Sequence, residues 1–154
     1  ALKAFLEEYR YAEPPYPTAY DFLDQLEPRV PDSLHYLIND WFKEITLYDF
    51  RLKDARAKKL DNGKYEIEMD IFARKAYADT LGNETEVQLR EWVDVGVYAD
   101  NDEEELMAWR RARFDQQEST VRMIVDSLPA KAAIDPRRIL IERVTDDNVK
   151  RISL

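Results

Sequence analysis

The sequence contains no cysteine, a single histidine and only three glycines. The absence of cysteine excludes disulfides, thiol catalysis and cysteine-ligated zinc or iron–sulfur sites. The lone histidine, His35, excludes an H-E-x-x-H zinc helix, which needs imidazoles at i and i+4. So few glycines also leave no glycine-rich loop to cradle a phosphate, and we expect no nucleotide-binding site.

Long apolar runs are missing too, and none approaches the roughly 20 residues that cross a bilayer. The chain begins with Ala1, and no basic segment precedes an apolar stretch and a cleavage site. We therefore expect a soluble, processed or truncated piece of a longer protein. At 154 residues and 45% hydrophobic content, it has enough apolar mass for one core, with or without a small appendage.

The chain has fewer basic than acidic residues: 23 against 32, which gives a net charge of -9. Such a chain repels phosphate backbones unless a local basic patch overcomes the repulsion. Arginines gather at 110–113 and 137–138, but acidic residues surround both groups and neither shows interleaved aromatic residues. We expect no nucleic-acid partner.

The hydrophobic period changes near residue 46, and up to that point it is helical. Apolar stripes predict three helices, of which the third is the strongest. Thr18 is the predicted N-cap of the second helix, with Asp21 in its first turn. The three stripes are Leu2, Phe5, Leu6 and Tyr9; Ala19, Phe22, Leu23 and Leu26; and Leu34, Leu37, Ile38, Trp41, Phe42 and Ile45.

From residue 47 onward apolar residues alternate with a period of two, which is typical of strands. Asn62-Gly63 predicts a hairpin turn, and Gly82-Asn83 predicts the next turn. Before the hairpin, the apolar phase slips from Leu52 to Ala55, which indicates a β-bulge or a bend. The predicted strands are 48–60, 65–74, 87–97 with Glu91 as the one break in the alternation, 106–114, 120–126, 130–134 and 139–143.

About seven strands without intervening helices favour an antiparallel sandwich. The predicted fold class is therefore α+β: a helical segment at residues 1–45, followed by an immunoglobulin-like β-sandwich at residues 46–154.

Few residues qualify for chemistry, and we assign no catalytic, cofactor-binding or metal-ligating residue. His35 lies beside the apolar stripe of the third predicted helix, and no nucleophile can be paired with it. The acids Glu66, Glu68 and Asp70 share one strand face, which a solvated sheet surface explains better than a glycosidase pair. The acidic turn 100–105 offers oxygen ligands for calcium, but it lacks the central glycine and spaced glutamate of an EF-hand loop. A solvated turn is the favoured interpretation.

Two aromatic residues raise the possibility of a binding face. Trp92 and Tyr98 fall on the side of their predicted strand opposite the valines. They pack against another element, or they form a platform for a sugar or a peptide, and packing is the favoured alternative.

The order of these elements resembles the end of the catalytic domain and the following β-sandwich in aminopeptidase N-like zinc metallopeptidases (gluzincins). The last segments resemble a bacterial subgroup in which this region is fused to an ABC-2-type permease membrane region. Arg137 and Arg138 depart from that subgroup, which has an aromatic and a polar residue there. The resemblance is carried by residues 5–9 (FLEEY), 18–23, 34–42, 129–136, 140–143 and 146–150.

The resemblance implies a non-catalytic C-terminal module of a membrane-linked metallopeptidase, whose zinc site would lie upstream. The module would brace the catalytic domain or shape access to its cleft. Its implied partner is that domain, its implied place is the extracytoplasmic soluble part of a bacterial membrane protein, and its exposed helix faces could also form a dimer. The alternative is an independent β-sandwich binding module for a peptide or a glycan.

Overall fold

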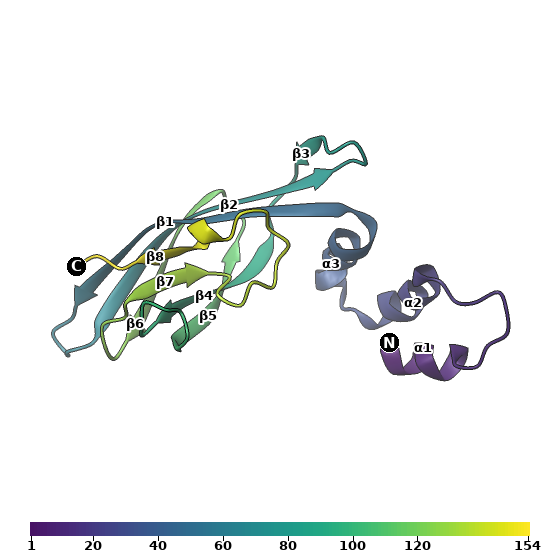
Figure 1. Cartoon of the computed structure of the whole chain (residues 1–154), viewed down its shortest axis with the longest axis horizontal. Helices are drawn as coiled ribbons and strands as arrows, with labels where there is room; N and C mark the ends of the chain where they lie inside the picture. The colour runs from purple at the N-terminus through teal and green to yellow at the C-terminus, as the bar shows by residue number, and fades with distance from the viewer. The chain divides into compact units, whose positions relative to one another are not determined.

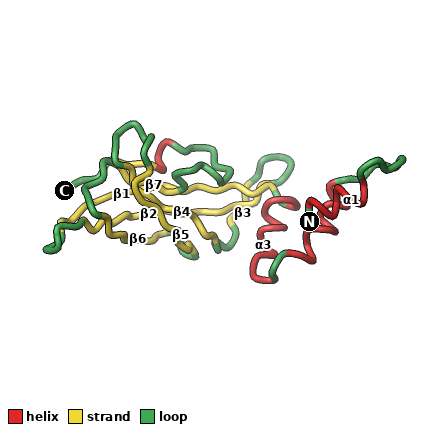
Figure 2. Tube along the Cα trace, turned by 90° about the horizontal axis from the view of Figure 1, so that it is seen from below, coloured by secondary structure: helices red, strands yellow, loops and turns green.

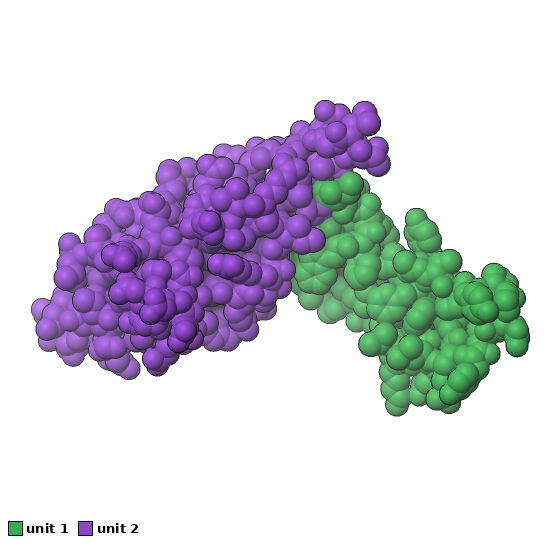
Figure 3. Space-filling view, viewed as in Figure 1, with its two compact units in different colours: residues 1–45 green, residues 46–154 purple.

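The computed structural model describes residues 1–154 and divides them into two compact units, Ala1–Ile45 and Thr46–Leu154 (Figure 1; Figure 3). The first unit is helical, and the second contains strands and one short 3-10 turn, Asp146–Asn148 (Figure 2). No helix combines the length and the apolar character needed to span a membrane. The predicted α+β class, with helices before an antiparallel β-sandwich, is confirmed.

The helical unit begins its second helix as predicted. The backbone N–H and the hydroxyl of Thr18 donate to Asp21 Oδ2 over 2.6 and 2.7 Å, which satisfies the cap and fixes the start of the helix. The elements are α1 (Leu2–Tyr9), α2 (Ala19–Leu26), the 3-10 turns Glu27–Arg29 and Asp32–Leu34, α3 (His35–Ile38) and the π-helical turn Asn39–Lys43.

The third predicted helix is interrupted, and this corrects its apolar stripe. The Glu44 N–H donates to the Asn39 carbonyl over 3.0 Å, a bond that spans five residues instead of four. The wider turn rotates the side chains near it out of the helical phase. Trp41 and Phe42 are consequently 58% and 46% exposed instead of forming a core, and Ile45 already belongs to the first strand.

The sandwich unit consists of two sheets. In one, β1 and β2 are neighbours, and the other side of β2 pairs with β6 along its first half and with β3 at its end. The other sheet has the order β5-β4-β7-β8. The strands are β1 (Ile45–Lys59), β2 (Tyr65–Ala78), β3 (Glu84–Glu86), β4 (Glu91–Tyr98), β5 (Leu106–Phe114), β6 (Glu118–Val125), β7 (Lys131–Ile134) and β8 (Val149–Arg151).

The hairpin between β1 and β2 confirms its sequence signal. The Leu60 N–H donates to the Lys64 carbonyl over 2.8 Å, and Gly63 takes φ +84°, which glycine adopts without strain. The phase slip in β1 is confirmed as well, because burial alternates up to Leu52 and resumes at Ala55. Side chains buried between the sheets include Phe50, Leu52, Ile67, Met69, Ile71, Val95, Val97, Phe114 and Ile134.

Two predicted strands are wrong. The segment 87–97 is broken at residues 87–90, because the chain leaves the sheet of β3 and enters the sheet of β4 there. The segment 139–143 forms no strand, because the Asp135 carboxylate accepts the N–H groups of Ile139 and Leu140 over 3.1 and 2.9 Å. These N–H groups are therefore not available for hydrogen bonds to a neighbouring strand. The last strand is instead β8, and the short strand β3, which was not predicted, raises the number of strands from about seven to eight.

The C-terminal segment lies alongside β1. Parallel bridges join Tyr48 to Glu142 and Arg56 to Ser153. Ser153 donates its N–H to the Ala55 carbonyl over 2.9 Å, and the Ala57 N–H donates to the Ser153 carbonyl over 2.7 Å. The edge of β1 is thus covered by the end of the chain.

A buried ion pair joins the two sheets. Lys75 continues the inward-facing positions of β2, and Glu91 begins those of β4. Lys75 Nζ and Glu91 Oε1 lie 2.9 Å apart, and each side chain is only 4% exposed. The pair neutralises two charges that would be costly to bury singly. It also explains why Glu91 breaks the apolar alternation.

Candidate functional site

The outer face of the sheet β5-β4-β7-β8 carries exposed tryptophans among arginines. The register places Trp92 opposite Arg113, Asp94 opposite Arg111 and Gly96 opposite Trp109, so these side chains share a face. Trp92 and Trp109 are 53% and 50% exposed. We call this surface the tryptophan–arginine face; it consists of Trp92, Trp109, Arg111, Arg113 and Arg137.

The buried carboxylate of Asp94 is hydrogen-bonded to two of these arginines. Its side chain is 3% exposed; it accepts a hydrogen bond from Arg111 Nε over 2.9 Å and another from a terminal nitrogen of Arg137. Burial alone would raise the pKa of Asp94, but the hydrogen bonds from the two guanidinium groups outweigh it and hold that pKa below its usual range. The buried carboxylate therefore stays ionised and fixes both guanidinium groups at the surface.

Arg137 is also held by its own turn and by an aromatic ring. The Asp135 carboxylate closes the turn that carries Arg137, and the Asp135 N–H donates to the Asp94 carbonyl over 2.8 Å. The Arg137 guanidinium lies 4.5 Å from the centroid of the Trp109 ring, a cation–π contact. These fixed positions reduce the side-chain entropy that binding would otherwise cost.

Gly96 allows the close approach of Trp109. A Cβ at Gly96 would lie 2.9 Å from Leu106 Cδ1, 3.0 Å from the Ala108 carbonyl oxygen and 3.3 Å from Trp109 Cβ. A side chain at this position would therefore push β5 and its tryptophan away from β4. The position of Trp109 on the tryptophan–arginine face therefore depends on the absence of a side chain at Gly96.

A groove borders the face where β5 and β6 separate into different sheets. Its volume is about 560 Å³, within the range of about 300–1,000 Å³ typical of ligand sites. Trp92 and three arginines of β5 line one side, and Ser119 and Thr120 of β6 line the other. The groove therefore shares Arg111 and Arg113 with the face and adds Arg110 as a further cationic donor.

Trp92 and Tyr98, the two aromatic residues considered as a binding platform from the sequence, differ in exposure. Trp92 is exposed on the outer face, whereas Tyr98 is buried and donates its hydroxyl hydrogen to the Pro136 carbonyl over 3.0 Å. The expectation that neither arginine group has interleaved aromatics is wrong, because strand pairing brings Trp92 and Trp109 among arginines from both groups. The signal was present in the alternation of Trp109, Arg111 and Arg113 along one strand.

The other sequence candidates make local contacts. His35 is exposed at the start of α3, and its Nε2 lies 2.8 Å from the Val30 carbonyl oxygen. Asp70 and Glu68 pair with Arg56, and Glu68 pairs with Arg122 as well. No group of three or more His, Cys, Asp or Glu side chains is arranged to hold a metal ion.

The acidic turn 100–105 is closed by its own first residue. The Asp100 carboxylate accepts backbone N–H groups from Asp102, Glu104 and Glu105, and these hydrogen bonds lower the pKa of Asp100. Glu103 is bonded to Lys131 over 2.7 Å. These contacts support the interpretation as a solvated turn.

A second, smaller pocket of about 180 Å³ is lined by a part-buried carboxyl group that the sequence did not single out. Glu142 accepts the Phe50 N–H over 2.5 Å and a hydrogen bond from Asn148 Nδ2 over 2.6 Å. Burial is the main reason that the pKa of Glu142 rises to about 7, with Asp147 and Asp49 adding to the rise. Asn148 Oδ1 is buried without a hydrogen-bond partner.

Replacing Glu142 with glutamine is expected to remove a pH dependence of stability. The folded protein holds the Glu142 proton up to a pKa of about 7, whereas the unfolded chain releases it near the ordinary value of 4.5. Wild-type stability should therefore fall by about 1–3 kcal/mol between about pH 5 and pH 8. Glu142→Gln should flatten this fall and be the more stable form at about pH 8, because a flipped Asn148 amide can accept from the new Nε2.

The measurement is urea unfolding of wild type and variant at about pH 5 and about pH 8. Glu104→Gln, which neutralises an exposed carboxylate, is the matched control and should leave the wild-type slope unchanged. A slope that persists in Glu142→Gln would contradict the assignment to Glu142.

Comparisons of the chain with protein-family models, with curated proteins and with solved structures find no match. Its function is accordingly inferred from the residues of the chain itself and from the resemblance of its elements.

Proposed function

We propose that the chain is a non-catalytic module of a larger, aminopeptidase N-like zinc metallopeptidase of the bacterial permease-fused subgroup. Residues 1–45 would complete the wall of its catalytic domain, and the sandwich would brace that domain or shape access to its cleft. The observation that carries the proposal is the exposed apolar surface of the helical unit. A surface of this kind is suited to burial against another folded domain.

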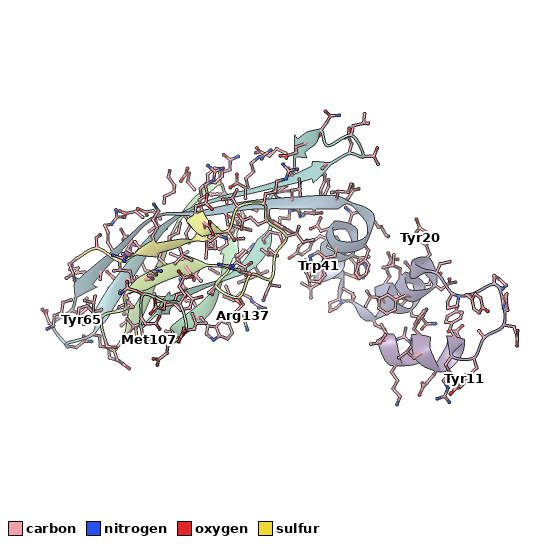
Figure 4. The ribbon with its side chains drawn as sticks, in the orientation of Figure 1. Tyr11, Tyr20, Trp41, Tyr65, Met107 and Arg137 are labelled. Atoms are coloured by element: carbon pink, nitrogen blue, oxygen red, sulfur yellow. The ribbon has the colours of Figure 1, made fainter.

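The helical unit buries little of its own apolar surface. Leu23 and Ile38 are its buried hydrophobic side chains, whereas Leu2 and Leu6 of α1 are 61% and 52% exposed. Its aromatic rings form an open chain of contacts, with centroids 5.5 Å apart for Phe5–Phe22 and 6.3 Å apart for Phe22–Phe42. Figure 4 shows Trp41 projecting from the end of this unit. These exposed side chains would be covered by the adjoining catalytic domain.

The non-catalytic part of the proposal is supported by the engagement of the lone histidine. His35 Nε2 lies 2.8 Å from the Val30 carbonyl oxygen, five residues earlier in the chain. We assign no zinc ligand to this chain, because the resemblance places the zinc site in the catalytic domain upstream. The extracytoplasmic location of the module belongs to the same proposal.

An aminopeptidase assay tests the proposal. Residues 1–154, incubated with a fluorogenic aminoacyl-coumarin substrate and added zinc, are expected to show no turnover above buffer, because a single histidine cannot form the paired imidazoles of an H-E-x-x-H zinc site. A known aminopeptidase in parallel verifies the assay. Zinc-dependent turnover that a chelator abolishes would overturn the non-catalytic assignment.

A second candidate function is an independent binding module for a peptide or a glycan. The specific observation in its favour is the tryptophan–arginine face, where two half-exposed tryptophans accompany arginines that a buried aspartate holds in place. Exposed tryptophans and arginines are enriched at recognition surfaces. The two functions are compatible, since the main support for the first is the exposed surface of the helical unit and the support for the second is one face of the sandwich.

A further inference from the structure

We infer that the tryptophan–arginine face binds an extended acidic peptide, which adds as a strand to the free edge of β5. The inference rests on the second candidate function and specifies its ligand. Three observations carry it: the free edge of a long strand, the arginines concentrated along that strand, and their spacing on one face.

The first observation is the position of β5 in its sheet. In the order β5-β4-β7-β8, β5 pairs with β4 on one side and is terminal on the other. The next strand along the chain, β6, pairs with β2 in the other sheet, and the groove of about 560 Å³ opens between them. Alternate residues of the nine-residue strand β5, those whose N–H and C=O groups point away from β4, therefore offer backbone donors and acceptors to an incoming strand.

The second observation is the charge along this edge. Arg113 lies 3.9 Å from exposed Asp115, Arg110 has no carboxylate partner, and Arg111 uses only Nε on Asp94. Terminal N–H groups of all three guanidiniums remain for a ligand. Glu118 also lines the groove but is paired with Lys53 over 3.1 Å. On a chain of net charge -9, the three arginines therefore make this edge locally positive, and carboxylates are its complement.

The same arginines would also select the partner. Charged side chains on an edge strand discourage pairing with neutral or basic strands. A strand that carries carboxylates at matching positions converts that penalty into charge-assisted hydrogen bonds. The arginines of β5 thus disfavour pairing with neutral or basic strands and favour pairing with an acidic strand.

The third observation sets the register of the peptide. Trp109, Arg111 and Arg113 occupy alternate positions of β5 and so share the outer face, with about 7 Å between successive side chains. An antiparallel peptide would match them with an acidic residue, a second acidic residue two positions later, and an apolar or aromatic residue two positions further. The expected motif is acidic-x-acidic-x-aromatic.

The test is a titration of residues 1–154 with the capped peptide Thr-Glu-Thr-Glu-Thr-Phe-Thr, followed by tryptophan fluorescence and calorimetry. We expect saturable binding that weakens as salt is added, because exposed charges are screened. The scrambled peptide Thr-Glu-Glu-Thr-Thr-Thr-Phe, in which the two acids face opposite sides, should bind about tenfold more weakly. The basic counterpart Thr-Lys-Thr-Lys-Thr-Phe-Thr should not bind.

Variants of the protein locate the site. Arg113→Ala removes one exposed guanidinium and should weaken binding of the alternating peptide about tenfold. Arg151→Ala removes the same charge from β8, at the opposite edge of the same sheet, and should bind like wild type. Circular dichroism of both variants verifies that the sandwich is folded.

Equal affinity for the alternating and scrambled peptides, or equal losses in the two arginine variants, would overturn the inference. Binding of a galacturonate tetrasaccharide in place of the peptide would also overturn it, but would leave the second candidate function standing. Failure of the peptides and the saccharide at about 1 mM would contradict both.

Discussion

Replacing Glu91 with alanine is expected to lower the free energy of unfolding by about 3–5 kcal/mol. The substitution leaves the Lys75 ammonium buried between the sheets without its carboxylate, at a position where the side chain is only 4% exposed. A domain of this size is stable by about 5–15 kcal/mol, so the loss is a large fraction of the total. Urea unfolding followed by tryptophan fluorescence measures it.

The double variant Lys75→Met/Glu91→Leu is the control. Removing both charges together leaves no uncompensated ion, so its stability should be close to or above that of wild type. If Glu91→Ala and the double variant lose equal free energy, the cost comes from lost packing and not from an unpaired charge. That outcome would contradict the electrostatic explanation.

Replacing Phe50 with alanine is expected to cost a similar amount, about 3–5 kcal/mol. Phe50 is fully buried, stacks on Tyr48 with ring centroids 5.8 Å apart and meets Phe114 edge-on at 6.2 Å. Its truncation leaves a cavity between the sheets that the surrounding strands cannot close. Chemical unfolding of the whole chain measures the change.

Trp41→Ala provides the contrasting case in the helical unit. Trp41 is 58% exposed, so its truncation in this chain should cost less than about 1 kcal/mol, although tryptophan is the larger side chain. A loss near that of Phe50→Ala would show that Trp41 is already buried without the catalytic domain. It would thereby remove the main support for docking of residues 1–45.

The sequence predicts the sandwich well where local chemistry decides the structure. Asn62-Gly63 sets a turn because glycine accepts positive φ, and Thr18 with Asp21 sets a helix start because both cap bonds are local. The slip of phase between Leu52 and Ala55 is visible because burial follows the alternation of side chains. None of these features depends on a distant residue.

The failures share a different cause, since each depends on a partner far away in the sequence. Glu91 is an anomaly in its own strand and is explained only by Lys75, sixteen residues earlier on the other sheet. Residues 139–143 have the composition of a strand, but the Asp135 carboxylate takes their donors. The groove between β5 and β6 likewise exists only because the two strands join different sheets.

The tryptophan–arginine face could be predicted only in part from the sequence. Trp109, Arg111 and Arg113 alternate along one strand, so their common face was open to prediction from sequence. Trp92 joins them only through the register of β4 with β5, and Arg137 only through the turn at Asp135. A site assembled from three separate segments needs the pairing of strands before its chemistry can be recognised.

The cover that Ser153 provides for β1 has a consequence for folding. Ser153 and Ala55, which are bonded to each other, are 98 positions apart in the chain. Closing so long a loop is entropically costly, and contacts between residues so far apart in the chain form slowly. Until the loop closes, the edge of β1 is open to strands of other chains, so the segment around Ser153 acts as a guard against aggregation.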